Sequence, residues 1–203
     1  MTGAILSGGE NRRIPVLKGF LTVGGRAIIE RSVEVLGRVF DKVVISTNMP
    51  EKYFSLGVPL IGDIRKERGP LTGILSVLIA TGEDAVFVIA GDMPFVSEKL
   101  IRFMAGHYTQ EESVQGTRRY DAMVPVFNGR REPLFGVYAK TAAPVMDRRI
   151  ENGQRSAADL LAHLRVRDVA EEEIRSVDPA GDSFVNINTM EDYERIGGKT
   201  CLV

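Results

Sequence analysis

The amino-acid sequence predicts an α/β fold with three layers, in which helices cover both faces of a doubly wound, parallel sheet. Short runs such as residues 85–90 are apolar at every position, which is typical of strands that are buried on both faces. Segments with apolar residues at helical spacing, such as residues 27–39, alternate with these runs. This alternation of strand and helix is typical of βαβ units.

The first half of the chain carries most of this pattern. Strands are expected at residues 3–7, 42–47, 58–61 and 85–90. Between them, helices are expected at residues 27–39 and 71–80. The carboxyl ends of parallel strands meet at one edge of a sheet, where the ligands of such folds bind. The residues that directly follow these strands are therefore the first candidates for a site.

After residue 92 the regular alternation of predicted strands and helices ends. Helices are expected at residues 97–107, 142–151, 156–164 and 191–196, with Ser97 and Thr189 as N-caps. Strands are expected at residues 121–127 and 134–138, joined by a polar turn that begins at Asn128, and at residues 184–187. The chain has no internal repeat and no convincing linker, so we expect one domain over residues 1–203.

Composition argues against several classes of function. The net charge is −1, which gives no basic footprint for nucleic acid. No apolar run approaches the roughly 18–20 residues that span a bilayer. The single cysteine, Cys201, rules out an intramolecular disulfide and suits a reducing compartment. We therefore expect a cytoplasmic protein that binds neither nucleic acid nor membrane.

A glycine-containing loop, residues 7–18, follows the first strand. Gly8 and Gly9 let backbone N–H groups approach a phosphate chain closely, and Arg13 and Lys18 can neutralise its charge. A tight turn with solvated cations explains the same residues equally well. The loop has neither the GxGxxG spacing of dinucleotide dehydrogenases nor the GxxxxGK[ST] spacing of P-loop enzymes.

Two aspartates end strands at the same predicted edge. Asp92 follows the most apolar strand, and Asp63 follows a shorter one. Magnesium is held by one or two carboxylates plus substrate phosphates, so Asp92 alone can serve as its protein ligand. A turn or helix-capping role before Pro94 is the alternative for Asp92.

Gly73 falls in the first turn of a predicted helix, where glycine costs about 1 kcal/mol relative to alanine. Close approach of a ligand explains its presence, and so does packing of the helix against a strand.

Taken together and in order, five segments of the chain resemble the molybdenum cofactor guanylyltransferase family, within the wider nucleotidyltransferase superfamily. They extend over nearly the whole sequence. The matching segments are Leu6-Ser7-Gly8-Gly9 with Arg13 and Lys18, Gly69-Pro70-Leu71-Thr72-Gly73, Gly91-Asp92-Met93-Pro94-Phe95, Glu132-Pro133-Leu134-Phe135-Gly136-Val137-Tyr138, and Val185-Asn186-Ile187-Asn188-Thr189.

The resemblance implies a Rossmann-like, mostly parallel mixed sheet that binds Mg-GTP along its carboxyl edge. On this pattern the nucleotide is held by Leu6, Ser7, Gly8, Gly9, Lys18, Ser46 or Asn48, Asp63, Gly73 and Asp92. Arg13, Lys18 and Asp92 act in catalysis, and Asp92 is the ligand of Mg²⁺. Asn186 and Asn188 face the molybdopterin acceptor, and other proteins of molybdenum cofactor biosynthesis or molybdoenzymes are the implied partners.

Two positions depart from the family pattern. Pro15 stands where the family usually has glycine, and Leu17 stands where it usually has an acidic residue before the lysine. Proline removes a backbone donor and excludes positive φ. Leucine removes a carboxylate that would orient Lys18.

The resemblance also implies a reaction that needs no catalytic histidine. GMP is transferred from Mg-GTP to the terminal phosphate of molybdenum-molybdopterin, which gives molybdopterin guanine dinucleotide and pyrophosphate. The attacking phosphate is already an anion, and His107 and His163 both lie in predicted helices far from the loops. The alternatives are a related nucleotidyltransferase that uses CTP or another phosphorylated acceptor, and a non-catalytic nucleotide-binding relative.

Overall fold

The computed structural model describes residues 1–8, 17–110 and 120–197. Within these segments, eight strands form one mixed sheet, whose order is β10-β7-β9-β6-β1-β4-β5, with β8 paired to β7. The strands are β1 (Thr2–Leu6), β4 (Val43–Ser46), β5 (Leu60–Ile61), β6 (Ala85–Ala90), β7 (Ala122–Phe127), β8 (Arg130–Arg131), β9 (Phe135–Ala139) and β10 (Val166–Val169).

The strands β5, β4, β1 and β6 are parallel to one another, and so are β10 and β7. β9 lies antiparallel between these two groups, paired to β6 on one side and β7 on the other. The predicted class, a mostly parallel mixed sheet with flanking helices, is thereby confirmed. From β1 the chain moves to β4 and β5 on one side and returns to β6 on the other. The direction of winding therefore reverses at the carboxyl end of β1.

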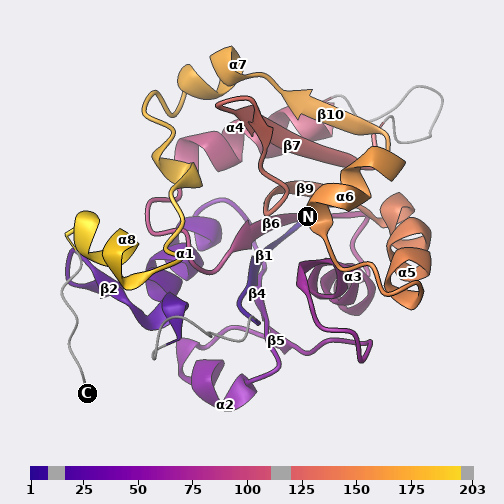
Figure 1. Ribbon diagram of the computed structural model, residues 1–203, viewed down its shortest axis with the longest axis horizontal. Coiled ribbons are helices and arrows are strands. Elements are labelled where there is room, and N and C mark those ends of the chain that lie inside the picture. Colours follow the sequence, from indigo (N-terminus) through magenta and orange to yellow (C-terminus); the bar gives the residue numbers. More distant parts are fainter. Residues whose placement is uncertain (9–16, 111–119, 198–203) are drawn as a thin grey trace.

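Helices cover both faces of the sheet, and α1 and α3 lie on opposite sides of β1 and β4 (Figure 1). The helices are α1 (Ile28–Gly37), α2 (Pro50–Tyr53), α3 (Pro70–Thr81), α4 (Glu98–Gln110), α5 (Ala143–Glu151), α6 (Ala157–Leu160), α7 (Glu171–Arg175) and α8 (Met190–Arg195). None of the helices in the described segments is both long and apolar enough to cross a bilayer.

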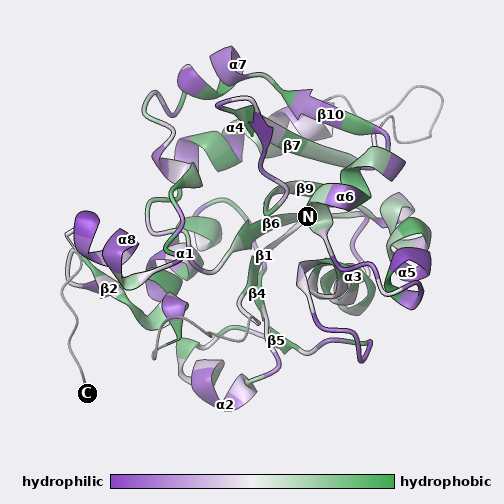
Figure 2. Ribbon diagram, in the orientation of Figure 1, coloured by the Kyte–Doolittle hydropathy of each residue, from purple (hydrophilic) through white to green (hydrophobic). Residues whose placement is uncertain are grey.

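The alternation of side chains along each strand divides the core into two clusters. From β6, Phe87 and Ile89 pack with α1 and α4, whereas Val86 and Val88 pack with α3, α5 and α6. This two-sided burial is why β6 is apolar at every position. Figure 2 shows the same division, with hydrophobic strands in the interior and hydrophilic residues on peripheral elements such as α7.

Two N-caps and one turn match the sequence-based expectations. The Ser97 hydroxyl accepts a hydrogen bond from the Leu100 N–H, and the Thr189 hydroxyl accepts one from the Asp192 N–H. Asn128 and Gly129 have φ of 49° and 70°, so both residues lie in the left-handed region that the tight hairpin between β7 and β8 requires.

One expected strand is wrong. Residues 182–184 form a short 3₁₀ helix, and residues 185–187 do not pair with the sheet. The backbone N–H of Ile187 instead donates to the carbonyl oxygen of Asp92, at 3.1 Å. Conversely, the strand β10 and the small hairpin of β2 (Thr22–Val23) and β3 (Arg26–Ala27) were not expected. Both are too short or too polar to show an apolar run.

Gly136 in β9 has no space for a side chain. A Cβ atom there would lie 2.5 Å from the Met123 carbonyl oxygen and 3.1 Å from a methyl of Val124. We expect Gly136→Ala to lower the free energy of unfolding by about 1–3 kcal/mol, because overpacking displaces the neighbouring strand. Urea denaturation measures this change. Gly106→Ala in α4 is the control, since no atom lies within 4 Å and alanine favours a helix.

Asp121 ties β7 to the start of β10. Its carboxylate accepts hydrogen bonds from the Arg165 guanidinium, the Arg165 N–H and the Thr141 hydroxyl. The hydrogen bonds from Arg165 lower the pKa of Asp121 from its usual 3.8 to about 2. This carboxylate therefore contributes stability above pH 3.8 that is lost as the pH falls toward 2. We expect Asp121→Asn to flatten that part of the pH dependence of unfolding, and an unchanged slope would contradict the assignment.

Candidate active site

A pocket of about 270 Å³ lies at the carboxyl ends of β1, β4, β5 and β6. Its lining consists of Leu6, Ser7, Gly8, Leu17, Lys18, Gly19, Ser46, Thr47, Asn48, Tyr53, Asp63, Gly69, Pro70, Gly73, Ala90, Gly91, Asp92 and Leu134. Gly8, which follows β1, and Asp92, which follows β6, thus line one pocket.

Most of the residues proposed from sequence lie in this lining: Leu6, Ser7, Gly8, Lys18, Ser46, Asn48, Asp63, Gly73 and Asp92. Gly9, Arg13 and Pro15 lie outside the described residues. Asn188 contacts the lining residue Lys18. Asn186 is not part of the lining, and its amide donates to the Phe184 carbonyl oxygen at 3.2 Å.

Gly91 allows β1 and β6 to stay paired until the site is reached. Its N–H donates to the Leu6 carbonyl oxygen at 2.9 Å, next to the paired residues Leu6 and Ala90. A Cβ atom at Gly91 would lie 2.9 Å from the Ser7 hydroxyl oxygen and 3.1 Å from the Leu6 carbonyl oxygen. The missing side chain therefore permits the close approach that places Gly8 and Asp92 side by side.

Lys18 and Asp92, which both line the pocket, form an ion pair. The Lys18 ammonium lies 3.0 Å from a carboxylate oxygen of Asp92 and 3.2 Å from the side-chain oxygen of Asn188. The side chains of Lys18 and Asp92 are 22% and 23% exposed, so solvent screens the pair less than it screens a surface ion pair. Lys18 is thus oriented by Asp92 and Asn188, although Leu17 provides no carboxylate.

The C-terminal segment contacts the site through Ile187 and Asn188. The Ile187 side chain is buried with Leu21, Val23, Ile28 and Tyr193 in a third, smaller core cluster. This cluster packs the segment against the β2–β3 hairpin. Asn188 is thereby positioned to accept a hydrogen bond from Lys18, which is 170 residues away in the sequence.

Ser7 and Tyr53 are joined by a hydrogen bond between their hydroxyls, at 2.8 Å. Tyr53 is buried, with 1% of its surface exposed, and the ring of Phe20 lies 5.1 Å from its own. Burial raises the pKa of Tyr53 and the Ser7 hydrogen bond lowers it, and the phenol is protonated at neutral pH. The sequence-based analysis missed Tyr53, because a tyrosine on a short helix of mixed polarity carries no motif.

Asn48 and Asp63 hold each other in a fixed orientation. The Asn48 amide nitrogen donates to one Asp63 carboxylate oxygen at 2.6 Å, and the Asn48 side-chain oxygen accepts from the Asp63 N–H at 2.9 Å. Burial raises the pKa of the Asp63 carboxyl, while the Asn48 hydrogen bond lowers it. Among the described residues, no side chain or backbone group donates a hydrogen bond to the other carboxylate oxygen of Asp63.

Gly73 lies where α3 packs against the sheet. A Cβ atom there would lie 3.1 Å from the Ser46 hydroxyl oxygen and 3.3 Å from a methyl of Leu6. The glycine is explained by helix–strand packing at the wall of the pocket. Sequence-based reasoning did not propose the lining residue Leu134 as a site residue, although it belongs to one of the matching segments.

The residues present fit a magnesium ion. No group of three or more His, Cys, Asp and Glu side chains gathers into a metal site in the described part of the chain. Magnesium does not require such a group, because substrate phosphates and water complete its coordination. Asp92 offers one carboxylate ligand beside Gly8 and Lys18, which fits a magnesium ion that also binds substrate phosphates and water.

The fold and pocket define an α/β protein with a site at the carboxyl edge of its sheet, and comparisons with known proteins identify its class. Residues 3–169 match the family model of the MobA-like NTP transferase domain. The molybdenum cofactor guanylyltransferase of Desulfosudis oleivorans is 34% identical over 196 residues, which cover 96% of this chain and 93% of that protein.

Solved structures extend the comparison. The molybdopterin-guanine dinucleotide biosynthesis protein A of Archaeoglobus fulgidus is 30% identical, with a TM-score of 0.79, over 97% of this chain and 96% of its own. The 4-diphosphocytidyl-2C-methyl-D-erythritol synthase of Anaerococcus prevotii is 14% identical, with a TM-score of 0.66, over 96% of this chain and 93% of its own, which is a likeness of fold alone.

The chain is accordingly a nucleotidyltransferase. It belongs to the MobA-like NTP transferase family, the family of the molybdenum cofactor guanylyltransferases, as the sequence motifs indicate.

Proposed function

We propose that this nucleotidyltransferase moves GMP from Mg-GTP to the terminal phosphate of molybdopterin, and that it acts in the cytoplasm. The observation that carries this proposal is the Lys18–Asp92 pair, in a pocket where the loop after β1 meets the end of β6. The names of its relatives, which are molybdenum cofactor guanylyltransferases, support the choice of both substrates.

Asp63 and Asn48 are proposed to select the base. Guanine presents two adjacent N–H donors on its pyrimidine edge, and the free carboxylate oxygen of Asp63 is a matching acceptor. Cytosine presents one amino donor beside an acceptor ring nitrogen on its corresponding edge, so it does not offer Asp63 two adjacent donors. Asn48 keeps the carboxylate in place through its two hydrogen bonds.

The phosphates are proposed to occupy the space between Gly8 and Lys18. Gly8 lines the pocket, and among the described residues no atom would lie within 4 Å of a Cβ atom placed there. Lys18 supplies positive charge, and Arg13, which lies outside the described residues, is proposed to add to it. Asp92 would hold Mg²⁺, which when bound would neutralise charge on the transferring and leaving phosphates.

The reaction needs alignment more than proton transfer. An oxygen of the acceptor phosphate forms a bond to the α-phosphorus of GTP, and the bond from that phosphorus to the β-phosphate bridging oxygen breaks, which releases pyrophosphate. The nucleophile is an anion near neutral pH, so the protein's part is positioning and charge stabilisation. In agreement, neither His107 on α4 nor His163 belongs to the pocket lining.

The acceptor is proposed to lie on the side of the C-terminal segment, near Asn186 and Asn188. Asn188 bridges this side to Lys18. GTP and molybdopterin are then the small-molecule partners of a single domain, residues 1–203, which delivers its product to other proteins of cofactor biosynthesis or to molybdoenzymes. A preference for CTP, or nucleotide binding without pyrophosphate release, would replace this proposal with one of its alternatives.

Removing the metal ligand separates catalysis from folding. We expect Asp92→Asn to lower guanylyl transfer by about 100-fold or more, because the amide carries no charge for Mg²⁺. Pyrophosphate release measures the rate. Lys18→Ala should weaken GTP binding, whereas Lys52→Ala, an exposed lysine on α2, serves as the control. Near-full activity of Asp92→Asn with Mg-GTP would show that the metal assignment is wrong.

The base preference tests the role of Asp63. In a thermal-shift screen with magnesium, we expect GTP to raise the Tm more than CTP, ATP or UTP, because a bound ligand stabilises the native state. Asp63→Asn should reduce this advantage by placing an amide donor opposite the donors of guanine. Asp159→Asn on α6, an exposed aspartate outside the pocket lining, is the matched control. An unaltered GTP preference in Asp63→Asn would refute this role.

A further inference from the structure

Glu132, between β8 and β9, is a half-buried carboxylate outside the machinery described so far. No hydrogen bond or ion pair of its side chain occurs in the part of the chain that the structure describes. Burial raises the pKa of Glu132, and the charge of Arg130 lowers it. A partly desolvated carboxylate without a donor is costly to the fold, and a ligand that brings donors would relieve that cost.

The strand register shows which face Glu132 occupies. Val126 of β7 pairs with Arg131 of β8. The N–H of Glu132 donates to the Pro125 carbonyl oxygen at 2.9 Å, so Glu132 lies opposite Pro125. Opposed residues of an antiparallel pair share one face. Side chains alternate along β7, so Pro125 lies on the same face as Met123 and Phe127. Both Met123 and Phe127 pack into the core cluster on the side of α1 and α4. Glu132 therefore lies on that same face.

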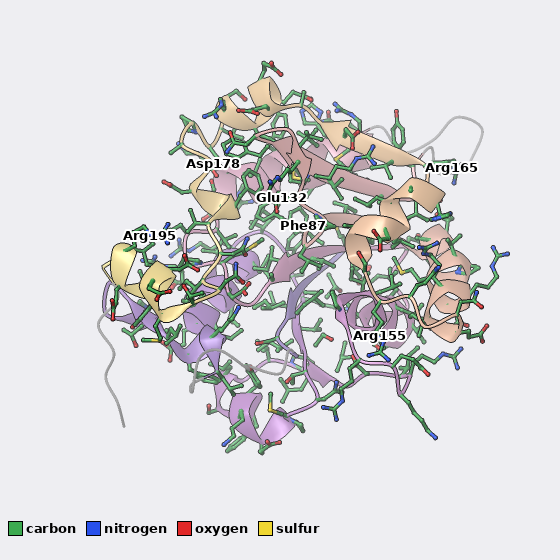
Figure 3. All side chains as sticks on the ribbon, viewed as in Figure 1. Phe87, Glu132, Arg155, Arg165, Asp178 and Arg195 are labelled. Atoms are coloured by element: carbon green, nitrogen blue, oxygen red, sulfur yellow. The ribbon has the colours of Figure 1, made fainter. Side chains whose placement is uncertain are left out.

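The C-terminal segment lies on this face as well. The ring of Phe184 is 5.0 Å from that of Phe127 and 5.6 Å from that of Phe135. From Phe184 the chain runs through Asn186 to Asn188, which contacts Lys18. Glu132 thus belongs to the region between the proposed acceptor side and Leu134, which lines the pocket. Figure 3 shows Glu132 at the loop before β9, above Phe87 of β6.

Asp63 and Glu132 lie on opposite sides of the reacting centre. The order of strands places β5, which precedes Asp63, three positions from β6 on one side, about 14 Å at the spacing of paired strands. Glu132 precedes β9, the neighbour of β6 on the other side. The Lys18–Asp92 pair is at the end of β6, between them. Two carboxylates therefore flank one phosphate-handling centre.

The chemistry of the proposed product matches this arrangement. Guanine and pterin contain the same 2-amino-4-oxopyrimidine ring, whose amino group and adjacent ring N–H form a pair of donors. A carboxylate accepts such a pair with its two oxygens. We propose that Glu132 recognises the pyrimidine edge of a pterin acceptor through the same pair of donors that the free oxygen of Asp63 is proposed to accept from guanine. This inference rests on the proposed function, and it assigns the acceptor's ring system to a named residue.

Direct binding of small pteridines tests the inference without turnover. The probes are pterin, which has the 2-amino group, and lumazine, which has a carbonyl there. The chain contains no tryptophan, so pteridine fluorescence can be titrated with little background. We expect the wild-type protein to bind pterin about ten-fold more tightly than lumazine, because the lumazine carbonyl faces a carboxylate. Glu132→Gln should remove this preference.

Two controls keep the outcomes distinct. Glu172→Gln, an exposed glutamate on α7, should retain the preference for pterin. The thermal shift of Glu132→Gln with Mg-GTP should equal that of the wild type, which shows an intact fold and nucleotide site. The inference is overturned if the wild-type protein binds pterin no better than lumazine, if it binds neither, or if Glu132→Gln keeps the preference. A changed magnesium requirement with an unchanged preference would instead make Glu132 a metal ligand.

This readout is independent of guanylyl transfer. A wild-type protein that transfers GMP normally but binds pterin no better than lumazine would remove Glu132 from the acceptor site and leave the proposed function standing. A clear pterin preference in a protein that transfers no GMP would support the role of Glu132 and contradict the proposed function.

Discussion

The pairing of β1 with β6 is the constraint on which the site depends. These parallel strands stay hydrogen-bonded through Leu6 and Ala90 and on to the Gly91 N–H, so the residues that follow them emerge at the same edge. Gly91 makes this possible, because any side chain would meet the Ser7 hydroxyl and the Leu6 carbonyl. Ser7, Gly8 and Asp92 are thereby brought into the lining of one pocket.

Contacts from Lys18 and from the C-terminal segment add to the site that the paired strands form. Lys18 crosses to Asp92, and the C-terminal segment crosses back to both through Ile187 and Asn188. The small cluster around Tyr193 holds that segment against the β2–β3 hairpin, and the Tyr193 hydroxyl donates to the Thr22 carbonyl oxygen at 2.7 Å. The proposed acceptor side is thus built by elements from the two ends of the chain, whereas the nucleotide side is built by β1, β4, β5 and α3.

This division explains which sequence-based expectations succeed. Strands buried on both faces, such as β6, are apolar throughout, and helix caps such as Thr189 follow local rules. Both can therefore be predicted from the sequence. The segment 184–187 is apolar in part and was expected to be a strand. Its apolar side chains instead reach two different clusters, Phe184 the larger and Ile187 the smaller, and its backbone bonds to a loop. Periodicity alone cannot distinguish these outcomes.

The sequence by itself determined the α/β class, the position of the candidate residues at strand ends and, through five weak motifs in order, the family. The tertiary structure alone decided which partners those residues have: Asn188 and Asp92 for Lys18, Asn48 for Asp63, and Tyr53 for Ser7. It also revealed that Glu132 has no described partner. The physical reason is that strand periodicity and capping are local properties of the chain, whereas hydrogen bonds between residues tens of positions apart depend on how the strands are ordered in the sheet.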